Sequence, residues 1–149
     1  MDIKYMEAAL KMAQKGLEKD EVPIGCVIVK DGKIIAKAIN SKEKKKSSVF
    51  HAEINCLMKA AKIIGDWRLD GCDVYVTLEP CIMCVGALIN YRVSNIYFGA
   101  YDFKGGALSS NLKLLEIKGL NHYPAFIGGI MEKECSQILK DYFKNKREK

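Results

Sequence analysis

The chain has 149 residues, of which 49% are hydrophobic and 28% charged, with a formal net charge of +6. This length suits a single domain over residues 1–149, which buries roughly two-thirds of its unfolded surface and needs no metal or disulfide merely to fold. The composition excludes a disordered chain, and no apolar run approaches the ~18 residues of a membrane span. The six cysteines stand in ordinary amphipathic segments, so we expect reduced thiols and a cytoplasmic protein.

The excess positive charge lies in two segments. Residues 42–46, KEKKK, carry four lysines against one glutamate, and residues 140–149, KDYFKNKREK, carry five basic against two acidic side chains. A basic surface segment usually serves solubility alone. The same pattern is also the electrostatic footprint of a phosphate-rich partner, so both interpretations stay open.

The first third of the chain predicts a helix and a hairpin. Apolar residues recur at helical spacing over residues 2–19. Strand-forming residues at 24–30 and 33–39 flank Asp31-Gly32, which is a strong signal for a hairpin turn. The lysine segment that follows is expected to be a loop.

The rest of the chain predicts alternating helices and strands. They are a helix from about His51, a strand over 73–79, a helix over 81–91 with Pro80 at its first turn, a strand over 94–100, a weaker strand over 125–129, and a closing helix from Met131 to Phe143. Strand, helix and strand in succession imply a parallel crossover. We therefore expect an α/β fold, a mixed five-stranded sheet with helices on both faces.

The stretch VTLEPCIMC, residues 76–84, carries the first chemical signal. Cys81 and Cys84 stand at the start of a predicted helix, where free N–H groups and the helix dipole favour the thiolate. The pair fits a redox dithiol, half of a structural zinc site, or two ligands of a catalytic metal. A structural zinc normally needs two such pairs, whereas the chain has one C-x-x-C. The other cysteines are most simply small core residues: Cys26, Cys56, Cys72 and Cys135.

A third metal ligand has to come from elsewhere in the chain. His122 lies in a turn-like stretch without a second candidate ligand beside it, whereas His51 opens HAE at a predicted helix start. His51, Cys81 and Cys84 then supply three ligands and leave a fourth position for water, the arrangement of a catalytic zinc. Zinc lowers the pKa of such a water, and Glu53 is placed to take its proton and pass it to the leaving group.

HAE followed by PCIMC matches the signature of zinc nucleobase deaminases. Further segments in order are EVPIGCVIV, Asn40, HAEINCL, YVTLEPCIMCVGALI, IYFGAYD and GLNH. Over essentially the whole chain the sequence resembles the bacterial tRNA adenosine deaminases, and TLEPCxMC favours that branch over the cytidine deaminases. The resemblance implies a three-layer α/β/α cytidine-deaminase-like fold. It also implies hydrolytic deamination of the wobble adenosine of a tRNA anticodon stem-loop to inosine, by a homodimer with one Zn2+ per subunit.

The resemblance also implies residue roles. His51, Cys81 and Cys84 match the zinc ligands, Glu53 the proton shuttle, and Asn40 the residue that hydrogen-bonds the purine. The remaining matches are pocket walls and a loop that holds the flanking RNA: Pro23, Ile24 and Leu78 for the walls, Asp102 and Lys104 for the loop.

Three departures from the family pattern concern substrate choice. SSVF at residues 47–50 places bulky Phe50 beside the predicted metal site. Phe103 stands where a small residue or proline is common, and ALSS at residues 107–110 replaces a run with more glycine. The predicted zinc ligands are untouched by all three.

Two other classes of function stay open. One is a deaminase of a free base or nucleoside, of guanine or cytosine type, on the same zinc core. The other is a non-enzymatic module with a structural metal, which a fourth protein ligand would support. The basic closing helix favours RNA, since a small free base does not require phosphate contacts.

Overall fold

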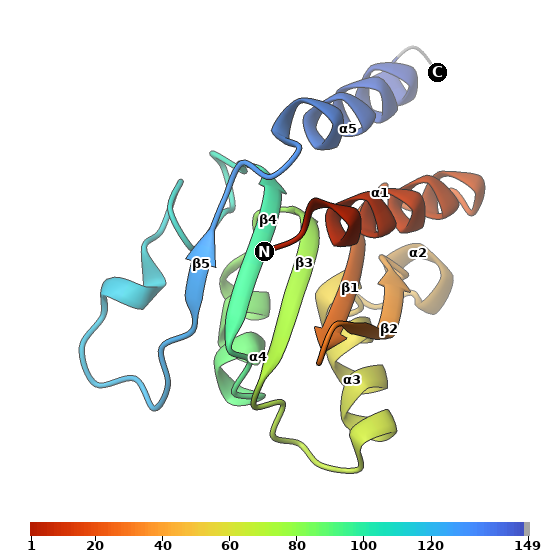
Figure 1. Ribbon diagram of the computed structural model, residues 1–149. Helices are drawn as coiled ribbons and strands as arrows, with labels where there is room; N and C mark the ends of the chain where they lie inside the picture. The colour runs from red at the N-terminus through yellow and green to blue at the C-terminus, as the bar shows by residue number, and fades with distance from the viewer. Residues whose placement is uncertain (148–149) are drawn as a thin grey trace.

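The computed structural model describes residues 1–147, which form a five-stranded sheet between two layers of helices (Figure 1). The strands are β1 (Gly25–Lys30), β2 (Lys33–Ile39), β3 (Cys72–Leu78), β4 (Asn95–Ala100) and β5 (Ala125–Ile127). The helices are α1 (Ile3–Glu18), α2 (Lys42–Lys45), α3 (Ala52–Ile64), α4 (Ile82–Asn90) and α5 (Glu132–Arg147), with a 3-10 turn η1 (Leu114–Glu116).

The strand order is β2-β1-β3-β4-β5. β1 pairs antiparallel with β2 and with β3, whereas β4 pairs parallel with β3 and with β5. The sheet is therefore mixed, and the predicted parallel connection through α4 is confirmed.

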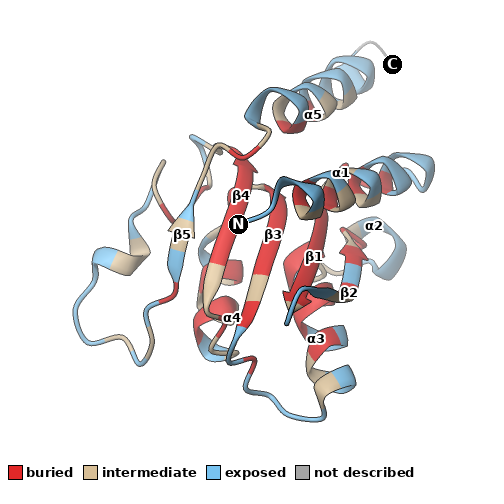
Figure 2. Ribbon diagram, in the orientation of Figure 1, coloured by how far each residue is buried: buried red, intermediate tan, exposed pale blue. Residues whose placement is uncertain are grey.

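Strand residues alternate between two cores, because successive side chains point to opposite faces of a sheet. Cys26 and Ile28 of β1 pack with α3 and α4, and Val27 and Val29 pack with α1. The central strands β1, β3 and β4 are buried along most of their length (Figure 2). The cysteines that the sequence assigned to the core are all buried: Cys26, Cys56, Cys72 and Cys135.

The hairpin between β1 and β2 forms where the sequence placed it. Lys30 pairs with Lys33, and the two turn residues have positive φ, 51° at Asp31 and 73° at Gly32. Two positive φ values define a type I′ turn, which matches the twist of the flanking strands.

The lysine segment is a short helix, so the expected loop was wrong. The carboxylate of Glu21, which is 1% exposed, accepts the backbone N–H of Glu43 at 3.1 Å and that of Lys44 at 2.9 Å. These bonds satisfy donors that the start of a helix leaves unpaired. The fold thus stabilises α2 through a residue far upstream. The turn η1 was also not predicted, and α5 runs to Arg147, one turn beyond Phe143.

The predicted site residues gather at one edge of the sheet. The register pairs Ile39 of β2 with Gly25 of β1, and Cys26 with Val76 of β3, so the end of β2, the start of β1 and the end of β3 meet there. Among the described residues, no helix is both long enough and apolar enough to cross a membrane.

Candidate active site

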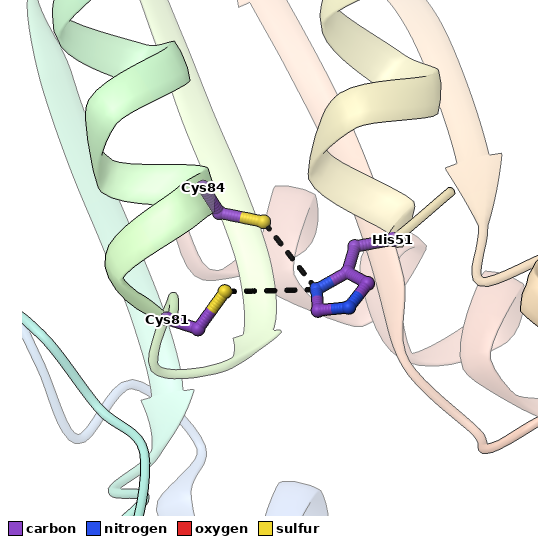
Figure 3. A group of neighbouring side chains, drawn as sticks. All are labelled: His51, Cys81 and Cys84. Atoms are coloured by element: carbon purple, nitrogen blue, oxygen red, sulfur yellow. Dashed lines mark hydrogen bonds between the residues drawn. The ribbon is translucent and has the colours of Figure 1, made fainter. Parts of the chain in front are cut away.

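His51, Cys81 and Cys84 converge at the N-termini of α3 and α4 (Figure 3). His51 and Cys81 are the residues that precede the two helices, and Cys84 lies in the first turn of α4. Nδ1 of His51 lies 3.7 Å from Sγ of Cys81 and 3.5 Å from Sγ of Cys84. All three candidate ligand atoms lie within 4.8 Å of one another, so this group could hold a metal ion.

The three side chains alter one another's protonation. The pKa of Cys81 is lowered to about 4, chiefly by a hydrogen bond from the Cys84 thiol and also by His51, against the opposing effect of burial. The same interaction with Cys81, together with burial, raises the pKa of Cys84. The pKa of His51 is raised, first by its hydrogen bond with Cys81. Cys81 therefore favours the thiolate, the form that binds metals.

Glu53 lies in the first turn of α3, two residues after His51, and is only 4% exposed. Burial raises the pKa of its carboxyl group, and its own backbone N–H and the charge of His51 oppose that rise. Desolvation of this kind brings a carboxyl group toward the range in which it can both accept and return a proton.

The end of β2 connects the candidate metal ligands to the predicted base-contacting residues. Asn40 is 3% exposed, and its backbone N–H donates to the carbonyl of Ile24 at 3.3 Å. The next residue, Ser41, donates its backbone N–H to the carbonyl of Phe50 at 2.9 Å, directly before His51. Pro23 is buried and Ile24 half-buried. The structure thus brings Asn40 and Ile24 together and links them to the start of α3.

Leu78, Asp102 and Lys104 line one cavity of about 820 Å³ between the end of β3, the loop after β4 and α5. Its walls are mostly apolar and include the aromatic residues Tyr101, Phe103 and Phe143. Its basic side chains are Lys104 from the loop and Lys140 and Arg147 from α5. Phe103 is 79% exposed. We name this cavity the α5 groove.

Glu79, which sequence analysis missed, holds the loop after β4 in place. It is 2% exposed, and its carboxylate accepts backbone N–H groups of Asp102 at 3.2 Å, Leu108 at 3.1 Å, Ser109 at 2.8 Å and Ser110 at 3.0 Å. The hydroxyl of Ser110 also donates to it. Burial alone would raise the pKa of Glu79, but these donors, with Ser109 first, lower it.

Two sequence features could have pointed to Glu79. An acid stands inside the apolar stretch YVTLEP, and buried acids need partners. The ALSS run, which differs from the family pattern, supplies Ser109 and Ser110 as donors.

A protein-family model described as MafB19-like deaminase matches residues 1–147. The fold, the candidate metal group and the buried Glu53 agree with that class, so the chain is a deaminase by class.

Comparison with individual relatives narrows the class. A tRNA-specific adenosine deaminase of Bacillus subtilis (strain 168) is 45% identical over 145 residues, which cover 97% of this chain and 90% of the relative. Another, from Agrobacterium fabrum (strain C58 / ATCC 33970), is 41% identical over 143 residues, which cover 96% and 94%. The chain belongs to the family of tRNA-specific adenosine deaminases, which confirms the resemblance seen in the sequence.

Among the solved structures, one from a study of tRNA deaminases is more similar to this chain than a guanine deaminase is. A structure from a study of A-to-I editing by tRNA deaminases at the wobble position of transfer RNA superposes with a TM-score of 0.90 at 40% identity, covering 93% of this chain and 100% of that chain. A guanine deaminase from Bacillus subtilis superposes with a TM-score of 0.64 at 30% identity, covering 81% and 78%. The cytidine-deaminase-like fold is therefore confirmed.

Proposed function

We propose that this protein, acting as one domain, hydrolyses the wobble adenosine of a tRNA anticodon to inosine and ammonia, with one zinc ion held by His51, Cys81 and Cys84. The observation that carries the proposal is the juxtaposition of three candidate metal ligands with a buried carboxylate, in a chain 45% identical to a tRNA-specific adenosine deaminase.

The donor set and its spacing support zinc. A tetrahedral zinc with Zn–S bonds of about 2.3 Å and Zn–N bonds of about 2.0 Å places sulfur roughly 3.5 Å from nitrogen. The two sulfur-to-nitrogen distances here are 3.7 Å and 3.5 Å. Both distances are close to that value, which supports zinc as the ion that these side chains would hold. When bound, zinc would supply Lewis-acid activation of the attacking water at neutral pH.

Glu53 is the residue that we propose to move protons. Its carboxylate accepts the proton that the attacking water loses and returns a proton to the leaving amine, which is general base and general acid work by one group. Its burial supports this role, because a desolvated carboxylate holds a proton more readily than an exposed one.

The remaining residues position the substrate. We propose that the amide of Asn40 hydrogen-bonds the purine, while Pro23, Ile24 and Leu78 form the walls that exclude water. The α5 groove would hold the flanking RNA, with Asp102 and Lys104 on the loop side. Exposed aromatic rings beside basic side chains are typical of surfaces that stack bases and contact phosphates.

The partner, the oligomeric state and the compartment are part of the same proposal. A tRNA anticodon stem-loop is the proposed partner, the active form is proposed to be a homodimer, and the compartment is proposed to be the cytoplasm. The alternative, a deaminase of free guanine or cytosine, has weaker support, because the guanine deaminase from Bacillus subtilis is 30% identical and superposes less closely.

The experiment compares substrates directly. Zinc-loaded protein is incubated with an anticodon stem-loop bearing a wobble adenosine and, separately, with free adenosine, guanine and cytosine, and ammonia release is measured. We expect release from the stem-loop and little from the free compounds. Efficient turnover of guanine or cytosine with none on the stem-loop would establish the small-molecule alternative instead.

A further inference from the structure

A second cavity, of about 740 Å³, opens beside Asn40 and has none of the candidate metal ligands in its lining. It is formed by residues after α1, the end of β2, α2 and α3. Figure 1 shows α2 at the margin of the sheet, beyond the end of β2. The cavity thus lies on the β2 side of the proposed base pocket, whereas the α5 groove lies on the β3 and β4 side.

The lining of this cavity is strongly basic. Five lysines border it, from three separate parts of the chain: Lys19, Lys44, Lys45, Lys59 and Lys62. Two acids also border it, Glu21 and the exposed Glu43, so basic side chains outnumber acidic ones by five to two. The carboxylate of Glu21 accepts the backbone N–H groups of Glu43 and Lys44. Within residues 1–147, none of the five lysines has a carboxylate oxygen within 4.0 Å. We name this cavity the lysine cavity.

Several of its polar side chains are held in place. Nζ of Lys59 donates to the carbonyl of Lys37 at 2.9 Å, and Nζ of Lys45 lies 4.3 Å from the centre of the Phe50 ring. Asn55 is 7% exposed and donates from Nδ2 to the carbonyl of Ile39 and to Oγ of Ser41, both at 2.8 Å.

One acceptor in the lining residues lacks a partner. Oδ1 of Asn55 is buried and accepts no hydrogen bond from any described residue. Buried polar atoms are nearly always satisfied, and an ordered water molecule is the usual donor for such an atom.

We propose that the lysine cavity binds backbone phosphates of the RNA next to the target nucleotide. This inference rests on the proposed function, because the RNA that the cavity binds would be the same anticodon stem-loop. Ammonium groups gathered without carboxylate partners repel one another, and a polyanion relieves that repulsion while releasing its own counterions. The RNA would be held on both sides of the base pocket, in the lysine cavity and in the α5 groove.

The test removes charge from the cavity without touching the proposed catalytic residues. The triple variant Lys44→Gln, Lys59→Gln and Lys62→Gln is compared with a control, Lys33→Gln, Lys113→Gln and Lys118→Gln, which removes the same charge from exposed lysines outside the cavity. Binding of a fluorescent anticodon stem-loop is measured by anisotropy between about 50 and 200 mM salt. Zinc content and thermal unfolding are recorded for both variants.

We expect the cavity variant to show a slope of log K against log salt that is shallower by roughly 2, at roughly 0.7–0.9 for each phosphate that is no longer neutralised. It should also bind at least about tenfold more weakly near 100 mM salt, whereas the control should stay close to wild type. Equal behaviour of the two variants would overturn the inference. Weaker binding with an unchanged slope would overturn it as well, because the lysines would then have neutralised no phosphate in the wild type.

Wild-type deamination of the same stem-loop is recorded in parallel. If wild type deaminates the RNA and both variants bind alike, the lysine-cavity inference fails while the proposed function stands. If wild type binds the RNA without deaminating it, the proposed function fails, and the difference between the two variants still decides the role of the cavity.

Discussion

Two buried carboxylates lie near the same edge of the sheet, and their surroundings give them opposite properties. Glu53 and Glu79 are 4% and 2% exposed, so burial alone would raise the pKa of both. It does so for Glu53, whereas the pKa of Glu79 is lowered because several N–H groups and a hydroxyl donate to its oxygens. Donated hydrogen bonds thus outweigh burial at Glu79, whereas burial outweighs the groups that lower the pKa of Glu53.

The two carboxylates also differ in the groups that lie beside them. Glu53 stands two residues after His51 at the start of α3, beside the candidate metal ligands. Glu79 bonds to a loop that contributes Asp102, Lys104 and Phe103 to the α5 groove. These surroundings support the proposed role of Glu53 in proton transfer, and we propose that Glu79 positions the loop.

The largest effect is expected from Glu53→Gln, which keeps the shape of the side chain and removes its basicity. Turnover of a stem-loop should fall by roughly 10²–10⁴-fold, the usual contribution of general acid–base catalysis. Zinc content and melting temperature should stay near wild type, because Glu53 is not among the proposed ligands. Loss of zinc in this variant would make Glu53 a fourth ligand and the site structural.

Substitution of Glu79 should have the opposite effect, a loss of stability rather than of turnover. Glu79→Gln should lower the free energy of unfolding by about 1.5–3 kcal/mol, the worth of hydrogen bonds to a charged group that an amide cannot replace. Turnover at saturating RNA should change much less than in Glu53→Gln, while KM rises, since the loop is displaced. Chemical denaturation and steady-state kinetics separate the two outcomes, and a Glu79→Gln variant with normal stability and lost kcat would exchange the two roles.

The difference in stability between wild type and Glu79→Gln should depend on pH in a direction set by the pKa of Glu79. The folded pKa of Glu79 is lowered relative to its unfolded value of about 4.3, so its ionised form stabilises the fold above that pH. The stability gap between wild type and Glu79→Gln should stay constant from about pH 7 to about pH 5 and shrink as pH falls through the folded pKa. A gap that closes well above the unfolded pKa would contradict the lowered pKa.

A smaller effect is expected at Gly106, which packs directly on Glu79. A Cβ at Gly106 would lie 2.3 Å from the carboxylate carbon of Glu79, whereas a Cβ at Gly86 would meet nothing within 4 Å. Gly106→Ala should therefore cost about 1–3 kcal/mol of stability, as over-packing does, and Gly86→Ala should cost nothing. Similar melting temperatures for the two variants would show that the loop shifts freely and that Glu79 does not fix it.

The smallest effect is expected at Lys104, an exposed side chain on the loop that Glu79 holds. Lys104→Gln should weaken stem-loop binding a few-fold and reduce the salt slope by roughly 0.7–0.9, which corresponds to one phosphate contact. Lys113→Gln is the matched control on a segment outside the α5 groove. If both variants have the wild-type slope, the loop does not contact a phosphate through Lys104.

The sequence predicted a group of three candidate metal ligands that the structure brings together, but not the contacts that support them. His51, Cys81 and Cys84 stand out in the sequence because few residue types bind zinc. Strand-forming residues likewise placed every strand of the described sheet, and Asp31-Gly32 placed the hairpin. These signals are local, or they recur at the period of the secondary structure.

What the sequence did not predict depends on contacts between distant residues. α2 forms because the Glu21 carboxylate accepts N–H groups more than twenty residues later in the chain, so the lysine segment alone looked like a loop. The role of Glu79 depends on donors in the loop after β4, and although ALSS stands out in the sequence, only the fold shows that Ser109 and Ser110 donate to Glu79. The lysine cavity, too, exists only once the fold brings the segment after α1, the end of β2, α2 and α3 together.

Wobble-specific deamination is tested most directly by mapping inosine by position in a stem-loop that carries adenosine at the wobble position and elsewhere in the loop. Zinc-loaded wild-type protein and Glu53→Gln are incubated with this RNA, and the products are sequenced and analysed by mass spectrometry. We expect inosine at the wobble position alone with wild type, and almost none with Glu53→Gln. Inosine spread over all the adenosines, or formed equally by both proteins, would contradict this expectation.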